Sequence, residues 1–172
     1  LPEAIISTYT EFDKTKLKEL FDWADVVAIG SGLGKTVLAE QILTYALQYA
    51  KMPCIIDGDG LGILAEDIAL LEHKKQIILT PHVKEMSRLL QCEITELKED
   101  GMKFLDDFVR DYPVVCALKD ARTIVMGEDC NVYVNTTGNE SMAKGGSGDV
   151  LVGMTAGLLA QGLGRREACE RA

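Results

Sequence analysis

Residues 26–57 read VVAIGSGLGKTVLAEQILTYALQYAKMPCIID, and this stretch decides the fold. Two short, mainly apolar runs, Val26–Ile29 and Cys54–Asp57, enclose a segment from about Thr36 to Tyr49 in which apolar residues recur at helical spacing. The runs are continuously apolar rather than alternating, as in parallel strands that are covered on both faces. The stretch therefore predicts a strand, a glycine loop, a helix and a second strand, the repeating unit of an α/β sheet.

The same alternation continues on both sides of this unit. The further predicted elements are a helix over residues 15–24 capped by Asp13, a strand Ile77–Leu79 ended by Pro81, helices around Val83–Leu90 and Met102–Val109, a strand Val114–Leu118, and a hairpin formed by Thr123–Met126 and Val132–Val134. The predicted fold class is α/β, with a mainly parallel sheet flanked by helices on both faces and a late antiparallel hairpin. In such folds ligands gather beyond the carboxyl ends of the strands.

Composition limits the function classes. The chain has 172 residues, of which 47% are apolar and 26% charged, which is typical of one globular domain with a sizeable core. No apolar run reaches membrane-spanning length and no targeting segment is recognisable, so we expect no membrane partner and a cytoplasmic location. The net charge of −9, without a basic stripe, argues against a nucleic-acid partner. Five cysteines without C-x-x-C spacing indicate neither a disulfide framework nor a zinc site, and Cys54 and Cys116 are expected to be buried thiols.

The glycine loop IGSGLGKT, Ile29–Thr36, matches neither common nucleotide motif. A P-loop needs a glycine where Ile29 stands, and a dinucleotide fingerprint starting at Gly30 needs one where Lys35 stands. Two interpretations remain open: a loop that a ligand approaches closely, or a tight turn followed by a Thr36 helix cap.

Three further polar segments follow predicted strands, and each has a plain alternative. Asp57 and Asp59 are able to hold Mg²⁺ through water, although Asp-Gly pairs also form turns unaided, which is the favoured interpretation. His82 is either a ligand-facing residue or a helix cap. Lys119–Thr123 offers two cations and a hydroxyl to a phosphate, or forms a charged hairpin turn.

The stretch Thr136–Gly153, TTGNESMAKGGSGDVLVG, carries the sharpest chemical signal. Glycines ahead of an apolar helix let the backbone approach an anion, and the helix dipole adds positive charge there. Asp149 stands where that helix begins; a phosphate would repel it, but a substrate hydroxyl would donate a proton to it. A helix-start aspartate is also stabilising by about 0.3–1 kcal/mol without any function. That alternative leaves three glycines within four residues unexplained, so the sequence predicts a phosphate-handling site with Asp149 as its base.

In their order along the chain, these stretches resemble one family. The glycine loop, D-x-D-G-L, T-P-H-x-x-E-M-x-R-L, K-x-x-R-T and N-x-T-G-N-x-x-M-A-x-G-G-S-G-D-V-L-x-G are similar to the ADP/ATP-dependent NAD(P)H-hydrate dehydratases, which belong to the ribokinase-like superfamily. The matching segments span Gly30–Gly153, and the last motif is the most specific. The resemblance implies a repair reaction, in which hydrated NADH or NADPH is dehydrated at the expense of ADP or ATP, with Mg²⁺. The ring hydroxyl is phosphorylated and the phosphate then leaves.

The resemblance also implies residue roles. Asp149 is the catalytic base and touches the substrate. The anion hole consists of Gly145, Gly146, Ser147 and Gly148, and the nucleotide-binding residues are Lys119, Asp120, Ala121, Arg122, Thr123 and Gly148. The remaining substrate contacts are Gly32, His82 and Asn139. No metal ligands are assigned.

The chain departs from the family pattern at several positions. Asp120 stands where the family usually has glycine, Ser31 where proline is common, and Glu140-Ser141 where Pro-Gly is common. The chain also starts later and stops earlier than family members do. We therefore expect residues 1–172 to form a single ribokinase-like domain without the family's N- and C-terminal segments, and the family suggests a homo-oligomer.

Two rival functions use the same motifs. A ribokinase-like kinase would phosphorylate a vitamin precursor or sugar alcohol with the same anion hole and base, but would release the phosphorylated product. A non-catalytic nucleotide-binding module would bind without turnover. The combination of T-P-H-x-x-E with the long glycine motif favours the dehydratase.

Overall fold

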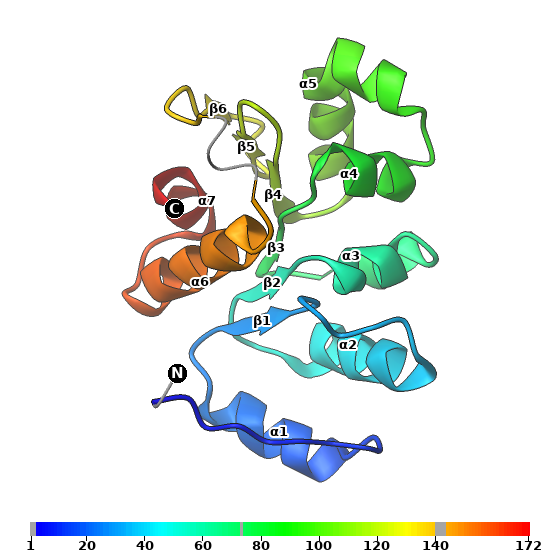
Figure 1. Ribbon diagram of the computed structural model, residues 1–172, viewed down its shortest axis with the longest axis vertical. Helices are drawn as coiled ribbons and strands as arrows, with labels where there is room; N and C mark the ends of the chain where they lie inside the picture. Colours follow the sequence, from blue (N-terminus) through cyan, green and yellow to red (C-terminus); the bar gives the residue numbers. More distant parts are fainter. Residues whose placement is uncertain (1–2, 73, 140–143) are drawn as a thin grey trace.

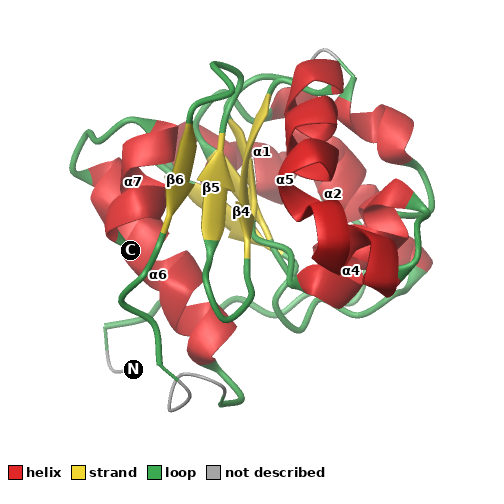
Figure 2. Cartoon of the chain, turned by 90° about the horizontal axis from the view of Figure 1, so that it is seen from above, coloured by secondary structure: helices red, strands yellow, loops and turns green. Residues whose placement is uncertain are grey.

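A six-stranded sheet forms the centre of the molecule, for which a computed structural model describes residues 3–72, 74–139 and 144–172 (Figures 1 and 2). Its strands are β1 (Val27–Ile29), β2 (Cys54–Ile56), β3 (Ile77–Leu79), β4 (Val114–Leu118), β5 (Ile124–Met126) and β6 (Val132–Val134). They lie side by side in the order β1-β2-β3-β4-β5-β6. The first four pair in parallel, whereas β5 and β6 are antiparallel. The predicted fold class, including the late hairpin, is confirmed.

Helices cover both faces of this sheet. The helices are α1 (Lys14–Trp23), α2 (Val37–Tyr49), α3 (Asp59–Leu64), the 3₁₀ turn η1 (Ile68–Leu71), α4 (Val83–Leu90), α5 (Ile94–Asp111), α6 (Ser147–Ala160) and α7 (Arg165–Arg171). In Figure 2, α2, α4 and α5 lie on one side of the strands, and α6 and α7 lie on the other. Within the described residues, no helix has the length and apolar character needed to cross a membrane.

The pleat of the buried strands divides the core into two layers. Cys54 and Ile56 point toward α2 and α3, whereas Ile55 between them packs with the layer that contains α6 and α7. These strand positions are fully buried on both faces, which explains why the apolar runs do not alternate with polar residues. Cys116 on β4 is fully buried as well, so the two predicted buried thiols are confirmed.

Hydrogen bonds confirm the predicted Asp13 cap of α1 and show that Thr36 caps α2, as in the tight-turn interpretation of the glycine loop. Asp13 Oδ1 accepts the N–H of Lys16 at 3.0 Å, and Thr36 Oγ1 accepts the N–H of Ala39 at 3.2 Å. Each side chain satisfies a donor that the first helical turn leaves free.

Two local predictions need correction. The turn predicted at Asp57–Gly60 is present, since the carbonyl of Asp57 accepts the N–H of Gly60 at 3.0 Å, but it leads directly into a helix that was not predicted. This helix, α3, begins at Asp59 and buries Leu61 and Leu64 in the core. The helix predicted at Met102–Val109 is the second half of α5, which begins at Ile94 and bends at Asp100, where φ is −135° and ψ is 39°.

Candidate active site

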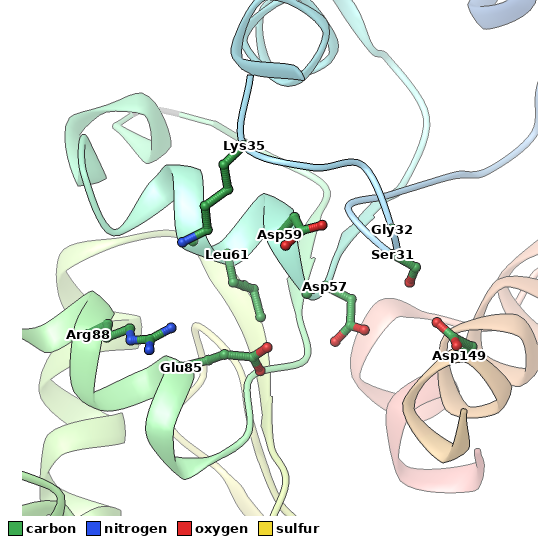
Figure 3. Close-up of a pocket in the computed structure, with 11 residues that line it drawn as sticks. Ser31, Gly32, Lys35, Asp57, Asp59, Leu61, Glu85, Arg88 and Asp149 are labelled. Carbon is green, nitrogen blue, oxygen red and sulfur yellow. The ribbon is translucent and has the colours of Figure 1, made fainter. Parts of the chain in front are cut away.

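A pocket of about 270 Å³ lies at the carboxyl ends of β1, β2 and β3 (Figure 3). Its lining consists of Ser31, Gly32 and Lys35 after β1, Asp57, Gly58, Asp59, Leu61 and Gly62 after β2, Glu85 and Arg88 on α4, and Asp149 on α6. Segments far apart in the sequence therefore share one crevice, as the parallel arrangement predicts.

The glycine loop after β1 packs directly on the segment after β2. Gly30 has φ +122°, and a Cβ at this position would lie 1.9 Å from the carbonyl oxygen of Asp57, so only glycine fits. The carbonyl of Gly30 accepts the N–H groups of Leu33 and Asp59, both at 3.1 Å. Asp59 Oδ2 in turn accepts the N–H of Gly34 at 2.8 Å. These bonds fix the loop so that Gly32, a predicted substrate contact, lines the pocket.

Asp57 joins the ends of three neighbouring strands. Its side chain is almost fully buried, and Oδ1 accepts hydrogen bonds from Thr80 Oγ1 and Lys119 Nζ, each at 2.7 Å. Thr80 follows β3 and Lys119 follows β4. A buried carboxylate that is paired with a cation and a hydroxyl has its charge compensated locally.

The start of α6 faces this ion pair. Gly146 caps the helix with φ +89°, a left-handed conformation that glycine adopts without strain. A Cβ at Gly148 would lie 3.4 Å from Lys119 Nζ and 3.7 Å from Asp57 Oδ2. Asp149, one residue later, is exposed, and its carboxylate points toward the side of the pocket where Ser31 and Asp57 lie (Figure 3).

The remaining residues of the predicted anion hole are exposed. The N–H and the hydroxyl of Ser147 both donate to the carbonyl of Lys144, at 3.2 and 2.9 Å. Gly145 has no atom within 4 Å of an added Cβ, so its surroundings are open to a ligand. Glu140 and Ser141, which depart from the family pattern, lie outside the described residues.

The predicted nucleotide segment Lys119–Thr123 lies beside the glycine motif rather than in the pocket. A Cβ at Gly138 would lie 3.4 Å from the carbonyl oxygen of Ala121. Asp120, Ala121 and Arg122 are exposed, as is Asn139 across the loop. Thr123 is half-buried and its carbonyl accepts the N–H of Asn135 at 2.9 Å.

His82 serves as the cap of α4. Its Nδ1 accepts the N–H of Glu85 at 3.1 Å, and Glu85 Oε2 accepts the N–H of His82 at 2.8 Å, which together form a capping box. His82 therefore caps α4, which was one of its two interpretations, and this residue does not line the pocket. The imidazole is half-exposed.

The described residues do not form a preorganised metal-binding site. They contain no group of three or more His, Cys, Asp or Glu side chains placed to hold an ion. Asp57 already bonds Lys119 and Thr80, and Asp59 bonds the Gly34 amide. These two carboxylates fit a Mg²⁺ ion only if it keeps most of its water molecules.

The pocket brings together two of the predicted site residues, Gly32 and Asp149, and adds residues for which no role was predicted. Lys35 belongs to the glycine loop and Arg88 to the segment T-P-H-x-x-E-M-x-R-L, but neither motif assigns a function to these residues. Only the folded arrangement places both at one pocket.

Comparison with known proteins places these motifs in a family. The family model described as NAD(P)H-hydrate dehydratase matches residues 1–172. The bifunctional NAD(P)H-hydrate repair enzyme of Moorella thermoacetica is 38% identical over 165 residues, which cover 95% of this chain and 31% of that protein. The ADP-dependent (S)-NAD(P)H-hydrate dehydratase of Neisseria meningitidis is 34% identical over 169 residues, which cover 95% of this chain and 57% of that protein. The chain thus spans about a third to just over half of these relatives.

A solved structure agrees with both comparisons. The ADP/ATP-dependent NAD(P)H-hydrate dehydratase of Bacillus subtilis, co-crystallised with ATP and Mg²⁺ and soaked with CoA, superposes with a TM-score of 0.75 at 31% identity. The match covers 85% of this chain and 52% of that one.

Proposed function

The chain belongs to the NAD(P)H-hydrate dehydratase family, and from this membership we propose that it acts in the dehydration of hydrated NADH or NADPH at the expense of ADP or ATP. One observation carries the proposal beyond family membership. Asp149 lines the pocket that also contains Gly32, while Gly148 beside it faces the ammonium of Lys119. The proposed base and the proposed phosphate-binding helix start are thus adjacent, as phosphorylation of a bound hydroxyl requires.

In the proposed reaction, Asp149 removes the proton of the ring hydroxyl as the oxygen attacks the terminal phosphoryl group of the nucleotide. The bond between that phosphorus and the nucleotide breaks, so that ADP yields AMP, or ATP yields ADP. The phosphorylated ring carbon then loses inorganic phosphate, and loss of a ring proton restores the double bond of NADH or NADPH. Placing the base in the first turn of α6 keeps it within reach of both the hydroxyl and the anion hole.

We assign the nucleotide to the surface formed by Lys119–Thr123 and the start of α6. Lys119 Nζ lies beside Gly148, so a phosphate at this helix start would meet both the ammonium and free backbone N–H groups. Arg122 is exposed and has no salt bridge to a described residue, which leaves it available to a phosphate or sugar. Asp120 places a negative charge in this segment, so binding there depends on the cations on either side of it.

The proposed Mg²⁺ ion would enter with the nucleotide and neutralise phosphate charge when bound. Asp57 and Asp59 are the pocket carboxylates that would bind such a partly hydrated ion through water. Asn139 and His82 are proposed to contact parts of the dinucleotide that extend beyond the pocket.

We further propose a cytoplasmic location and a homo-oligomeric state. The free cysteines of the described residues, three of them buried, fit a reducing compartment. The oligomeric proposal rests on the family resemblance and is checked by light scattering on the purified protein.

One experiment tests the function. The protein is incubated with hydrated NADH, Mg²⁺ and either ADP or ATP, and the absorbance of the reduced nicotinamide is followed together with released phosphate. Recovery of NADH with equal phosphate release supports the dehydratase. Stable phosphorylation of a small alcohol without NADH recovery would support the kinase instead, and nucleotide binding without either reaction would support a binding module.

A further inference from the structure

We propose that Lys35 and Arg88 form a phosphate subsite at the end of the pocket opposite Asp149, and that this subsite takes the phosphate attached to the nicotinamide ribose of the substrate. The inference rests on the proposed function and extends it to the orientation of the substrate. Figure 3 shows the two cationic side chains on one side of the pocket and Asp149 on the other.

Arg88 is a cation without an anionic partner in the described part of the chain. Four of the six arginines form salt bridges with acidic side chains, namely Arg110, Arg165, Arg166 and Arg171. Arg88 forms none with a described residue, although Glu85 stands one turn earlier on the same helix. The capping box explains this, because Glu85 Oε2 accepts the His82 N–H and Oε1 lies 3.5 Å from His82 Nε2. In a chain with net charge −9, a pocket arginine left unpaired in this way is available to an anionic ligand.

The position of the Lys35 side chain depends on the absence of a side chain at Gly62. A Cβ at Gly62 would lie 2.8 Å from Lys35 Cε and 2.9 Å from Lys35 Nζ, so any larger residue there would displace the ammonium. Gly62 stands within α3, where glycine is less favourable than alanine. Lys35 has no salt bridge with any residue that the structure describes. The glycine thus makes room for a lysine whose charge remains available within the pocket.

The charges of the pocket fix the direction in which a phosphorylated ligand enters. The pocket carboxylates Asp57, Asp59, Glu85 and Asp149 would repel a phosphate. Glu85 is the one beside Arg88, and its carboxylate accepts the His82 N–H. Lys35 and Arg88 attract a phosphate, and the guanidinium can bind two phosphate oxygens at once. With its phosphate at this end, the substrate would turn its ring hydroxyl toward Asp149. A volume of about 270 Å³ is small for a whole dinucleotide, so the pocket suits the nicotinamide mononucleotide half.

The test compares two ligands that differ only by this phosphate. Hydrated reduced nicotinamide mononucleotide and the corresponding riboside are titrated by calorimetry into the wild type, Lys35→Met and Arg88→Met. We expect the wild type to bind the mononucleotide about 10–100-fold more tightly, since charge-assisted hydrogen bonds have this magnitude. Each variant should reduce that ratio about tenfold and leave riboside affinity unchanged. Lys84→Met, which removes an exposed lysine of α4 that does not line the pocket, should keep the wild-type ratio.

A fourth variant tests the placement of Lys35 rather than its charge. Gly62→Ala keeps every charge and favours the helix, but pushes the lysine end away. It should lower the mononucleotide-to-riboside ratio severalfold without lowering thermal stability.

The outcomes separate this inference from the proposed function. Equal wild-type affinity for both ligands, or wild-type ratios in Lys35→Met and Arg88→Met, would overturn the subsite even if hydrated NADH is repaired. A phosphate preference that depends on both residues, in a protein that does not repair hydrated NADH, would uphold the subsite and overturn the function. Failure to bind either ligand would overturn the subsite, and the repair of hydrated NADH would then decide the function separately.

Discussion

The ammonium of Lys119 lies 2.7 Å from Asp57 Oδ1, so the end of β4 is tied to the end of β2 across the intervening strand β3. Thr80, which follows β3, donates to the same oxygen at 2.7 Å. This arrangement directs Lys119 toward Gly148 at the start of α6. The ion pair therefore links the pocket, which it borders through Asp57, to the proposed nucleotide surface.

Lys119→Met tests the structural contribution of this pair. The variant leaves the nearly buried Asp57 carboxylate with Thr80 as its remaining side-chain partner, which should lower the free energy of unfolding by about 1–3 kcal/mol in urea titrations. Lys18→Met removes one partner of the exposed Lys18–Asp22 pair and should leave stability near that of the wild type. Equal stability of Lys119→Met and the wild type would show that water compensates Asp57 after the change.

Asp149→Asn tests the proposed base. The amide keeps the size of the side chain but accepts no proton, so turnover of hydrated NADH should fall roughly 10²–10⁴-fold while nucleotide affinity is retained. Asp107→Asn is a matched control, because that exposed residue on α5 lies outside the pocket and the variant carries the same change in charge. Near-normal turnover in Asp149→Asn would remove this residue from the catalytic role.

Gly148→Ala tests the close approach between the start of α6 and Lys119. The new methyl group would lie 3.4 Å from Lys119 Nζ, in the space where a phosphate is proposed to bind. We expect turnover to fall about 10–100-fold, because the anion-hole geometry is disturbed while the helix is retained.

Gly153→Ala is the control in the same helix. An added Cβ there has no atom within 4 Å, so this variant should gain about 0.5–1 kcal/mol of stability and keep its turnover. Equal turnover in both alanine variants would argue against an anion hole at Gly148.

The sequence predicted the sheet because its strands are buried on both faces and therefore appear as continuous apolar runs. The caps Asp13 and Thr36 were predictable for a similar reason, since each acts on a backbone amide three residues away. Helix α3 was not predictable in this way. Its Asp-Gly-Asp-Gly start favours a turn locally, and the helix depends on burial of Leu61 and on the close fit to Gly30.

The candidate site was predictable where chemistry is concentrated in one stretch, as at Asp149. It was not predictable where a role arises from residues far apart in the sequence. Asp57 and Lys119 are 62 positions apart, and neither local motif indicates that they pair. The unpaired charge of Arg88 likewise depends on Glu85, which accepts the N–H of His82. Both His82 and Arg88 are three residues from Glu85, so the spacing alone does not indicate which of them it bonds.

The thiol of Cys54 leads to a prediction at alkaline pH. Burial in β2 raises its pKa from an ordinary 9.0 to about 12, so the unfolded chain loses the proton at lower pH than the folded one. The stabilisation is complete below about pH 9 and is lost as pH rises toward 12. Wild-type stability should therefore fall more steeply than that of Cys54→Ala, by about 1.4 kcal/mol per pH unit in this window.

The cavity left by alanine lowers the variant's free energy of unfolding by the same amount at every pH, so it does not change the slope against pH. Ile55→Val, an equally buried change in the same strand without a titrating group, should give a curve parallel to the wild type in urea titrations. Parallel curves for Cys54→Ala and the wild type would mean that Cys54 ionises equally in both states.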